Sequence, residues 1–388
     1  MPPLLYLTGA RLVLADEIIE DGALLLEHGQ IRAINPDGAP QAKVVCLQGQ
    51  TLMAGLIDLH CDAFEKEFEP RPDVHFPLDF ALAQADKQNA AAGVTTVFHA
   101  LSFAHNEFGV RNNEVAASLA RGISNWRPTS LVENRVHCRY EVTDSLALPI
   151  LLQLLDEGTA DLISLMDHRP GQGQFANIAA YKAYHKTKYH RSDLEIDQLL
   201  ISKHNRSKEA FRQVRQLIQK AQEKHIFVAS HDNDHVAQIK RNHKLGVTLA
   251  EFPVNLETAQ AAQDVGMTTL FGAPNILRGQ SQSGAIKALD AVQHQVVDCL
   301  CGDYSSASLL AALFKLPEVS ALSLPQAAAL VTSNPAKAVG LHDRGVIQVG
   351  KRADLISVVH LGKQPQCSRV WVKGREVYQA NYRPSEWA

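Results

Sequence analysis

The sequence predicts an α/β protein built on a (β/α)8 TIM-type barrel, with a small β domain assembled from both ends of the chain. Three observations lead to this prediction. Short β-like segments occupy both ends, eight apolar segments of strand length alternate with helical ones between them, and most of the eight end in His, Asp or Glu. A chain of 388 residues with 46% apolar side chains can bury the large core that such a barrel requires.

The two ends of the chain share one pattern, in which β-like bursts are separated by turn signals. The bursts lie at residues 4–14, 22–34, 43–52, 345–359 and 367–378. The first three predict a small antiparallel unit, and the last two show the same pattern of short β-like segments. We therefore expect residues 1–52 and 342–388 to form one β domain and residues 53–341 to form the barrel.

Eight apolar, strand-length segments follow one another between these ends. They are residues 55–60, 94–101, 135–142, 161–168, 225–232, 246–254, 267–275 and 297–304. Helical segments fall between them, such as residues 77–93, which begin with Pro and end with Gly, and residues 207–225. Eight such units over roughly 270 residues fit a (β/α)8 barrel, which typically takes about 250. A doubly wound open sheet is the alternative.

Composition excludes several classes of protein. The net charge is −3 with both signs interspersed, which gives no overall field for nucleic acid or a membrane surface, so anion recognition must be local. The first residues lack a cationic leader, and no stretch approaches the ~20 apolar residues of a membrane span. We expect a cytoplasmic protein. The six cysteines contain no C-x-x-C pair and are predicted to be reduced thiols without disulfides.

Polar residues end the predicted strands, and a barrel keeps its active site at the carboxyl ends of its strands. His60 and Asp62 are two residues apart, so they project to the same side of their strand and can reach one ion. On the third strand His137, Arg139 and Glu141 share a face, and Glu141 lies nearest the rim. Burying several carboxylates together is costly without a cation, so the cluster predicts a metal site.

Two strands end in adjacent pairs, Asp167-His168 and His231-Asp232, of which one member each can point inward. The histidines are the better choice because neutral imidazole is the usual nitrogen ligand, and the neighbouring Asp can orient it. The predicted metal ligands are His60, Asp62, Glu141, His168 and His231. One or two divalent ions fit this set, and Zn, Mn, Fe and Ni all accept His with carboxylates.

The eighth strand carries Cys299, Cys301 and Asp303 on one face. Asp303 is nearest the rim and is the predicted general base. The two cysteines are expected to fill layers of the barrel rather than to bind metal. Four further residues stay open as members of the site: His99, His137, Asp167 and Glu251.

The segments "LMAGLIDLH" and "GVIQVGKRADLISVV" resemble the entry to and the exit from the barrel in the amidohydrolase superfamily. That resemblance implies a distorted TIM-type barrel flanked by a small β-sandwich domain from both chain ends. The sequence departs from the usual His-x-His motif, since it has His60-Cys61-Asp62, and it carries Glu141 on the third strand rather than a lysine on the fourth. A less common metal arrangement is therefore expected.

Longer stretches, such as "MDHRPGQGQF", "GAPNILRG" and "GDYSSASLL", are similar to the diphosphohydrolase family of the carbon–phosphorus lyase pathway for phosphonate use. This resemblance implies cleavage of α-D-ribose 1-methylphosphonate 5-triphosphate into the 5-phosphate and pyrophosphate with a divalent metal. His99 stands where that family is expected to carry an aspartate, and it is left outside the metal site.

A triphosphate needs positive charge and N–H donors around the departing pyrophosphate. Three places could supply them: the loop after the first strand, the "GQSQSG" turn, and an insertion at 171–207 that is a candidate lid or, alternatively, a solvated basic helix. The predicted contacts are Lys66, Arg71, Lys182, Lys186, Arg278, Ser281 and Ser283, with Arg191 also on the insertion.

Two alternative functions stay open. A hydrolase of cyclic or linear amides would use the same metal chemistry on a carbonyl group, and the basic contacts count against it. A barrel without catalysis could serve as a scaffold, but it would not need the full set of ligands and the acid at position 303. The expected partner is a small anionic phosphorylated substrate, and a homo-oligomer is possible.

Overall fold

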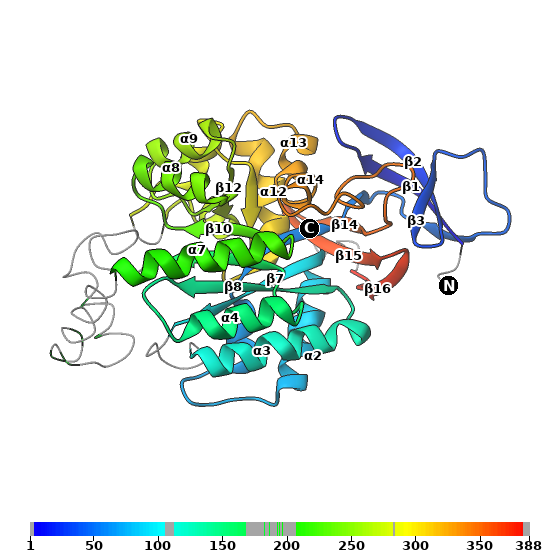
Figure 1. Cartoon of the computed structure of the whole chain (residues 1–388). Coiled ribbons are helices and arrows are strands. Elements are labelled where there is room, and N and C mark those ends of the chain that lie inside the picture. Colours follow the sequence, from blue (N-terminus) through cyan, green and yellow to red (C-terminus); the bar gives the residue numbers. More distant parts are fainter. Residues whose placement is uncertain are drawn as a thin grey trace.

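The computed structural model describes residues 4–104, 112–167, 207–281 and 284–382, together with residues 182, 186, 192, 194 and 196. Two sheets of eight strands each organise these residues. One sheet joins strands from both ends of the chain, which lie together in Figure 1 as blue and orange to red arrows. The other is parallel and carries the helices around it.

The terminal sheet has the order β16-β15-β14-β5-β1-β2-β3, with β4 also paired to β1. Its strands are β1 (Leu5–Val13), β2 (Ile18–Glu27), β3 (Gln30–Ile34), β4 (Lys43–Cys46), β5 (Thr51–Ala54), β14 (Leu355–Leu361), β15 (Gln364–Val372) and β16 (Arg375–Gln379). A β domain built from both ends is thus confirmed, and β1, β2 and β3 pair antiparallel as predicted, but the prediction is wrong for residues 43–52. β4 and β5 pair in parallel with successive parts of β1, because the chain crosses back after β3 before it forms them.

The parallel sheet holds the eight predicted strands in chain order. They are β6 (Leu56–Cys61), β7 (Val94–Phe103), β8 (Glu133–Glu141), β9 (Leu162–Met166), β10 (Phe227–His231), β11 (Leu249–Glu251), β12 (Thr268–Gly272) and β13 (Cys299–Cys301). A parallel bridge between Cys61 and Asp303 joins the end of β6 to the segment after β13. The first and last strands therefore meet, which confirms a nearly closed barrel and excludes the open sheet.

Helices connect the barrel strands and cover their outer face (Figure 1). The described helices are α1 (Ala63–Phe68), α2 (Leu78–Ala91), α3 (Asn113–Trp126), η1 (Arg127–Thr129), α4 (Ala147–Asp156), α7 (Ser207–Glu223), α8 (Val236–Leu245), α9 (Leu256–Asp264), α10 (Ala273–Arg278), α11 (Ala288–Gln293), α12 (Ala307–Val319), α13 (Leu324–Ala329) and α14 (Ser333–Ala338). Local signals define their ends: Asn112 caps α3 with its side chain, and Gly246 ends α8 in the left-handed region at φ 97°.

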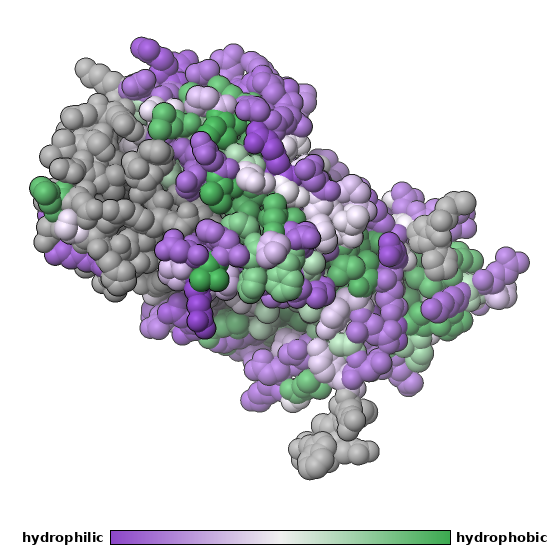
Figure 2. Space-filling view, turned by 90° about the horizontal axis from the view of Figure 1, so that it is seen from below, coloured by the Kyte–Doolittle hydropathy of each residue, from purple (hydrophilic) through white to green (hydrophobic). Residues whose placement is uncertain are grey.

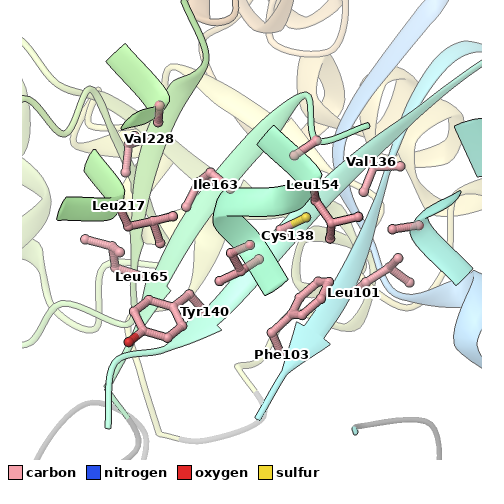
Figure 3. Close-up of a cluster of buried hydrophobic side chains, with 14 of the residues drawn as sticks. Leu101, Phe103, Val136, Cys138, Tyr140, Leu154, Ile163, Leu165, Leu217 and Val228 are labelled. Atoms are coloured by element: carbon pink, nitrogen blue, oxygen red, sulfur yellow. The ribbon is translucent and has the colours of Figure 1, made fainter. Parts of the chain in front are cut away.

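Side chains on β8 alternate between the helices and the barrel interior. Figure 3 shows Val136, Cys138 and Tyr140 among the hydrophobic side chains between the barrel strands and the surrounding helices, close to Leu154 of α4. The intervening residues of β8, which include the buried His137, face the opposite way. The alternation therefore delivers the polar residues of β8 to the interior.

The barrel interior below the rim is apolar, and every barrel strand except β8 contributes to its cluster. Cys299 and Cys301 belong to that cluster, as the sequence predicted, and all six cysteines are free. β8 contributes a fully buried histidine, His137, at this level instead of an aliphatic side chain. A buried polar ring at a position where the other strands carry apolar side chains requires hydrogen-bond partners.

The outer surface mixes residue types. Figure 2 shows hydrophobic residues in small areas of one face, separated by hydrophilic ones. Phe76 and Phe80 are among the large exposed hydrophobic residues, and their ring centroids lie 5.0 Å apart. Within the ranges that the structure describes, no helix is both long enough and apolar enough to cross a bilayer.

Candidate active site

Histidines and carboxylates meet at the carboxyl ends of β6, β10, β11 and β13. Their ligand atoms form two groups, in each of which all atoms lie within 4.8 Å of one another. The first group is His60, His231 and Glu251, and the second is His60, Asp62 and Asp303. His60 belongs to both, so one imidazole joins a deep, buried group to one at the mouth of the barrel.

A bulge in β6 sets the direction of His60. Between the pairs that Asp58 and Cys61 make with β7, β6 has one residue more than its partner. Such a bulge re-aims the side chains that follow it. Leu59 still belongs to the interior cluster, and above it Nε2 of His60 lies 3.4 Å from Oδ1 of Asp62. The two residues that the sequence placed on one side are thus brought together.

Three residues that follow strands at this rim have left-handed backbones: Asp232 (φ 54°), Phe252 (φ 50°) and Asp303 (φ 53°). Each donates its backbone N–H to a carbonyl of the neighbouring strand, at 2.8 or 2.9 Å. Non-glycine residues seldom adopt this conformation, which costs on the order of 1–3 kcal/mol. The sheet bonding outweighs that strain, and backbone strain of this kind clusters at functional sites.

Glu251 lies at the centre of the deep group and is fully buried. Ser164 donates a hydrogen bond of 2.6 Å to its Oε2, while Oε1 lies 3.4 Å from Nδ1 of His60 and 3.6 Å from Nε2 of His137. Burial alone would raise the pKa of Glu251, but the charge of His60 and its contact with Glu251 outweigh burial and hold the pKa below its ordinary range. The carboxylate is therefore ionised.

His137 presents a lone pair to this carboxylate. Its Nδ1 lies 3.1 Å from the carbonyl oxygen of Leu59 and must carry the proton, so Nε2 is the acceptor nitrogen. Burial lowers the pKa of His137 to about 3, which keeps the ring neutral. Nε2 is buried, has no hydrogen-bond partner among the residues that the structure describes, and faces Oε1 of Glu251. A cation beside these two electron-rich atoms would relieve their repulsion, so the donors fit a metal.

His60 lies between two carboxylates. Burial alone would lower its pKa, but Glu251 and Asp62 outweigh that effect and raise the pKa to about 10. Without a metal both ring nitrogens therefore hold protons at neutral pH. A metal ligand must be deprotonated, so a metal that binds His60 takes the place of one proton.

The mouth group is held by a buried arginine. Nη1 of Arg139 donates to both oxygens of Asp62, at 2.9 and 3.1 Å. Arg139 lies on the inward face of β8 that the sequence identified, although no role was assigned to it. Burial and then the charge of Asp62 raise the pKa of Asp303 above its usual value. A carboxylate with a raised pKa holds a proton more readily once it has accepted one.

Phe252 packs over the histidines. Its ring centroid lies 5.1 Å from that of His60 and 5.1 Å from that of His231. Oδ2 of Asp232 lies 3.1 Å from Nδ1 of His231 without the geometry of a hydrogen bond, so the orienting role of Asp232 stays a prediction. A cavity of about 140 Å³ opens beside His231. The site is therefore walled by an aromatic ring on one side and open on another.

Other candidate residues lie apart from the two groups or beyond the described ranges. Glu141 ends β8 and accepts a hydrogen bond of 2.7 Å from Thr143, and it belongs to neither group. His99 faces outward, with Nε2 2.8 Å from Asn134, which agrees with its exclusion from the metal site. His168, Ser283, Arg191 and most of 171–207 lie outside the described residues.

Of the predicted substrate contacts, Lys66 and Arg278 both lie close to Tyr304, at the rim. Arg71 is exposed and Ser281 is partly exposed. The structure describes Lys182 and Lys186 but few of the residues next to them in the chain. The roles of these residues stay predictions.

Sequence reasoning left Glu251 and His137 open and assigned no role to Arg139, Phe252 or Tyr304. A signal for Glu251 exists in the strand alternation. Leu249 belongs to the interior cluster, so the side chain two residues later points inward as well. Glu251 also pairs in register with His231, which puts the two at one level of the barrel.

Comparison with known proteins agrees with this fold. The amidohydrolase family model matches residues 51–377, and the chain belongs to this family. It is 35% identical, over 96% of its length and 100% of the relative, to the alpha-D-ribose 1-methylphosphonate 5-triphosphate diphosphatase of Escherichia coli strain K12. The family and this relative support a hydrolase.

Solved structures share the architecture at low identity. An N-acetyl-D-glucosamine-6-phosphate deacetylase from Mycobacterium smegmatis has a TM-score of 0.66 at 17% identity, covering 96% of this chain and 100% of that one. A 5-methylcytosine deaminase from Klebsiella pneumoniae has a TM-score of 0.65 at 13% identity, covering 98% and 99%. At these identities the likeness shows the fold alone.

Proposed function

We propose that the protein is a metal-dependent hydrolase that cleaves α-D-ribose 1-methylphosphonate 5-triphosphate into the 5-phosphate and pyrophosphate. The observation that carries the metal dependence is the buried Glu251 carboxylate, which faces the lone pair of His137 and the ring of His60. The substrate rests on the relative that carries this activity in its name, at 35% identity over nearly the whole chain.

The deep group of His60, His231 and Glu251 is the first candidate to hold the metal, with His137 beside it. The predicted ligands Asp62, Glu141 and His168 remain part of the proposal, since a second ion at the mouth would need further oxygen and nitrogen donors. When bound, a divalent metal activates water and polarises the phosphoryl oxygen under attack. His with carboxylates suits Zn, Mn, Fe and Ni alike.

The chain's own residues then move a proton and hold the charge. Asp303 lies within the mouth group, next to Asp62 and His60, and accepts the proton of the attacking water. Its raised pKa, caused by burial and Asp62, suits it to pass that proton to the oxygen that leaves with pyrophosphate. Arg139 fixes Asp62 and keeps a positive charge at the mouth, where anionic phosphoryl groups enter.

Phosphorus NMR tests the proposal directly. Protein loaded with Mn²⁺ is incubated with the triphosphate, and the resonances of pyrophosphate and of a 5-phosphomonoester should appear in equal amounts. Release of orthophosphate would place the cleavage at the terminal anhydride instead and contradict the proposal. An intact triphosphate, together with turnover of N-acyl or cyclic amide substrates, would favour the amide hydrolase. No turnover of either class by metal-loaded protein would favour the scaffold.

A further inference from the structure

Three side chains outside the histidine cluster meet at Tyr304. Nζ of Lys66 lies 5.4 Å from the centroid of the Tyr304 ring, and Nη1 of Arg278 lies 3.4 Å from its Oη. Lys66 is in α1, after β6, whereas Arg278 ends α10, after β12, and Tyr304 follows Asp303 after β13. Because β12, β13 and β6 are neighbours in the barrel, three adjacent loops deliver these side chains.

Both cations are exposed, and in the parts of the chain that the structure describes neither is within ion-pair distance of a carboxylate. Lys66 is placed over the π face and Arg278 at the hydroxyl, so one tyrosine fixes two positive charges. Like charges gathered around one ring repel each other, and an anion between them would turn that repulsion into binding energy. The arrangement therefore has the charge that an anion site requires.

The cluster lies beside the proposed general base. Tyr304 is the next residue after Asp303, and a Cβ built on Gly272, the N-cap of α10, would lie 3.7 Å from Oδ2 of Asp303. The left-handed backbone of Asp303 turns the chain so that its own side chain joins the mouth group while Tyr304 continues into the loop. An anion held at Tyr304 is consequently adjacent to the reacting centre.

We propose that Lys66, Tyr304 and Arg278 form a single subsite that holds the pyrophosphate part of the triphosphate, the part that leaves. This inference rests on the proposed function and specifies where its leaving group binds. The planar guanidinium of Arg278 suits two phosphoryl oxygens, and the ammonium of Lys66 suits a second phosphoryl group as a point charge. The exposed position of both cations at the rim gives pyrophosphate a direct route to solvent.

Calorimetric titration of the Mn²⁺-loaded protein with pyrophosphate alone tests this subsite without requiring turnover. We expect Lys66→Met and Arg278→Met each to weaken pyrophosphate binding about tenfold and the double variant about 100-fold, since each variant loses one charge-assisted contact with a phosphoryl group. Tyr304→Phe keeps the ring and should weaken binding only about threefold. Lys87→Met and Arg212→Met, which change exposed residues of α2 and α7, are matched controls and should bind pyrophosphate as the wild type does.

The outcomes separate the subsite from the activity. If the wild type binds pyrophosphate through Lys66 and Arg278 but leaves the triphosphate intact, the proposed function fails and the subsite stands. If the wild type cleaves the triphosphate and the double variant shows unchanged pyrophosphate affinity and unchanged KM, the subsite is overturned. Absence of pyrophosphate binding by the wild type would also overturn it.

Discussion

The two ends of the barrel use the same residue types in opposite ways. At the amino end, Glu133 at the start of β8 accepts hydrogen bonds from Arg344 at 2.7 Å and from Arg352 at 2.6 Å. Arg352 also pairs with the buried Asp354 at 2.6 Å. At the carboxyl end, Glu251 faces His60 at 3.4 Å and a lone pair of His137 at 3.6 Å.

The difference teaches which charges serve stability and which serve chemistry. Burial opposes ionisation of Glu133, but Arg344, Arg352 and Arg135 outweigh it and hold its pKa far below the ordinary range. That carboxylate is matched by permanent cations. At the rim Asp62 also pairs with an arginine, Arg139, but the charge of the buried Glu251 is faced by histidines, which can exchange a proton for a metal.

Cavity volume alone would select the amino end of the barrel instead of the rim. A cavity of about 880 Å³ lies at the amino end, and Arg127, Arg135 and Asp161 line it, whereas the cavity beside His231 has only about 140 Å³. The charged groups of the large cavity pair mostly with one another, as Arg127 does with Asp161. We therefore place the chemistry by the groups of metal-ligating atoms at the rim rather than by cavity volume.

Removal of the metal is the strongest way to test this contrast. We expect a chelator to lower kcat at least about 10³-fold and added Mn²⁺ to restore it, because the metal supplies both the activated water and charge stabilisation. The double variant His60→Ala/His231→Ala should carry less than a tenth of the metal that the wild type carries, measured by elemental analysis. Equal metal contents in the two proteins would contradict the assignment of the rim.

Asp303→Asn should have the next largest effect. The amide keeps the shape of the side chain but cannot accept a proton, so kcat should fall at least about 10²-fold while the fold and bound metal persist. Pyrophosphate release and circular dichroism are the measurements. Asp290→Asn, an exposed change on α11, is the control. A variant of Asp303 with nearly wild-type kcat would shift attention to another base.

The barrel and part of the group of charged residues at its rim could be predicted from the sequence. Buried parallel strands are continuous apolar runs, which is why all eight segments were found, and the polar residues that end most of these runs marked the rim. His60, Asp62, His231 and Asp303 were chosen on that basis, and the structure brings their ligand atoms together. Each sits at a strand end where its environment is dictated by the strand itself.

The rest of the site and of the fold depends on which residues of different strands lie side by side. The sequence alone does not specify this register. β11 has only three residues, so its alternation was too short to indicate that Glu251 faces inward. The contact of Arg139 with Asp62 spans 77 positions in the chain. The parallel pairing of β4 and β5 with β1 depends on a crossover whose direction turn residues do not specify. Long-range pairing of this kind is set by tertiary packing.

Phe252→Leu should have a smaller effect on the rim. Leucine keeps an apolar side chain but loses the ring contacts with His60 and His231. Since residues that orient ligands typically affect metal affinity about 10–100-fold, we expect Mn²⁺ to bind about tenfold more weakly, with kcat close to the wild type at saturating metal. Competition with a fluorescent chelator measures the affinity, and Phe80→Leu, at an exposed position, is the control. An unchanged affinity would mean that Phe252 only excludes solvent.

Glu133→Gln should leave the chemistry intact and affect stability alone. The glutamine cannot match the charges of Arg344 and Arg352, which are 6% and 9% exposed. Loss of one partner of a buried ion pair is strongly destabilising, so we expect the free energy of unfolding to fall by about 2–3 kcal/mol at neutral pH. The metal content and the kcat of the folded variant should stay at wild-type values. Glu318→Gln, an exposed change on α12, should alter neither.

The pH dependence of this difference identifies its source. The pKa of Glu133 is lower in the folded protein than its ordinary value of 4.5, so its contribution to stability is complete above that value and declines as the pH falls toward the folded pKa. The stability advantage of the wild type over Glu133→Gln, measured by urea unfolding, should therefore be constant near neutrality and shrink below about pH 4. A difference that is independent of pH down to that range would mean that side-chain packing, rather than the charge of Glu133, holds the amino end of the barrel together.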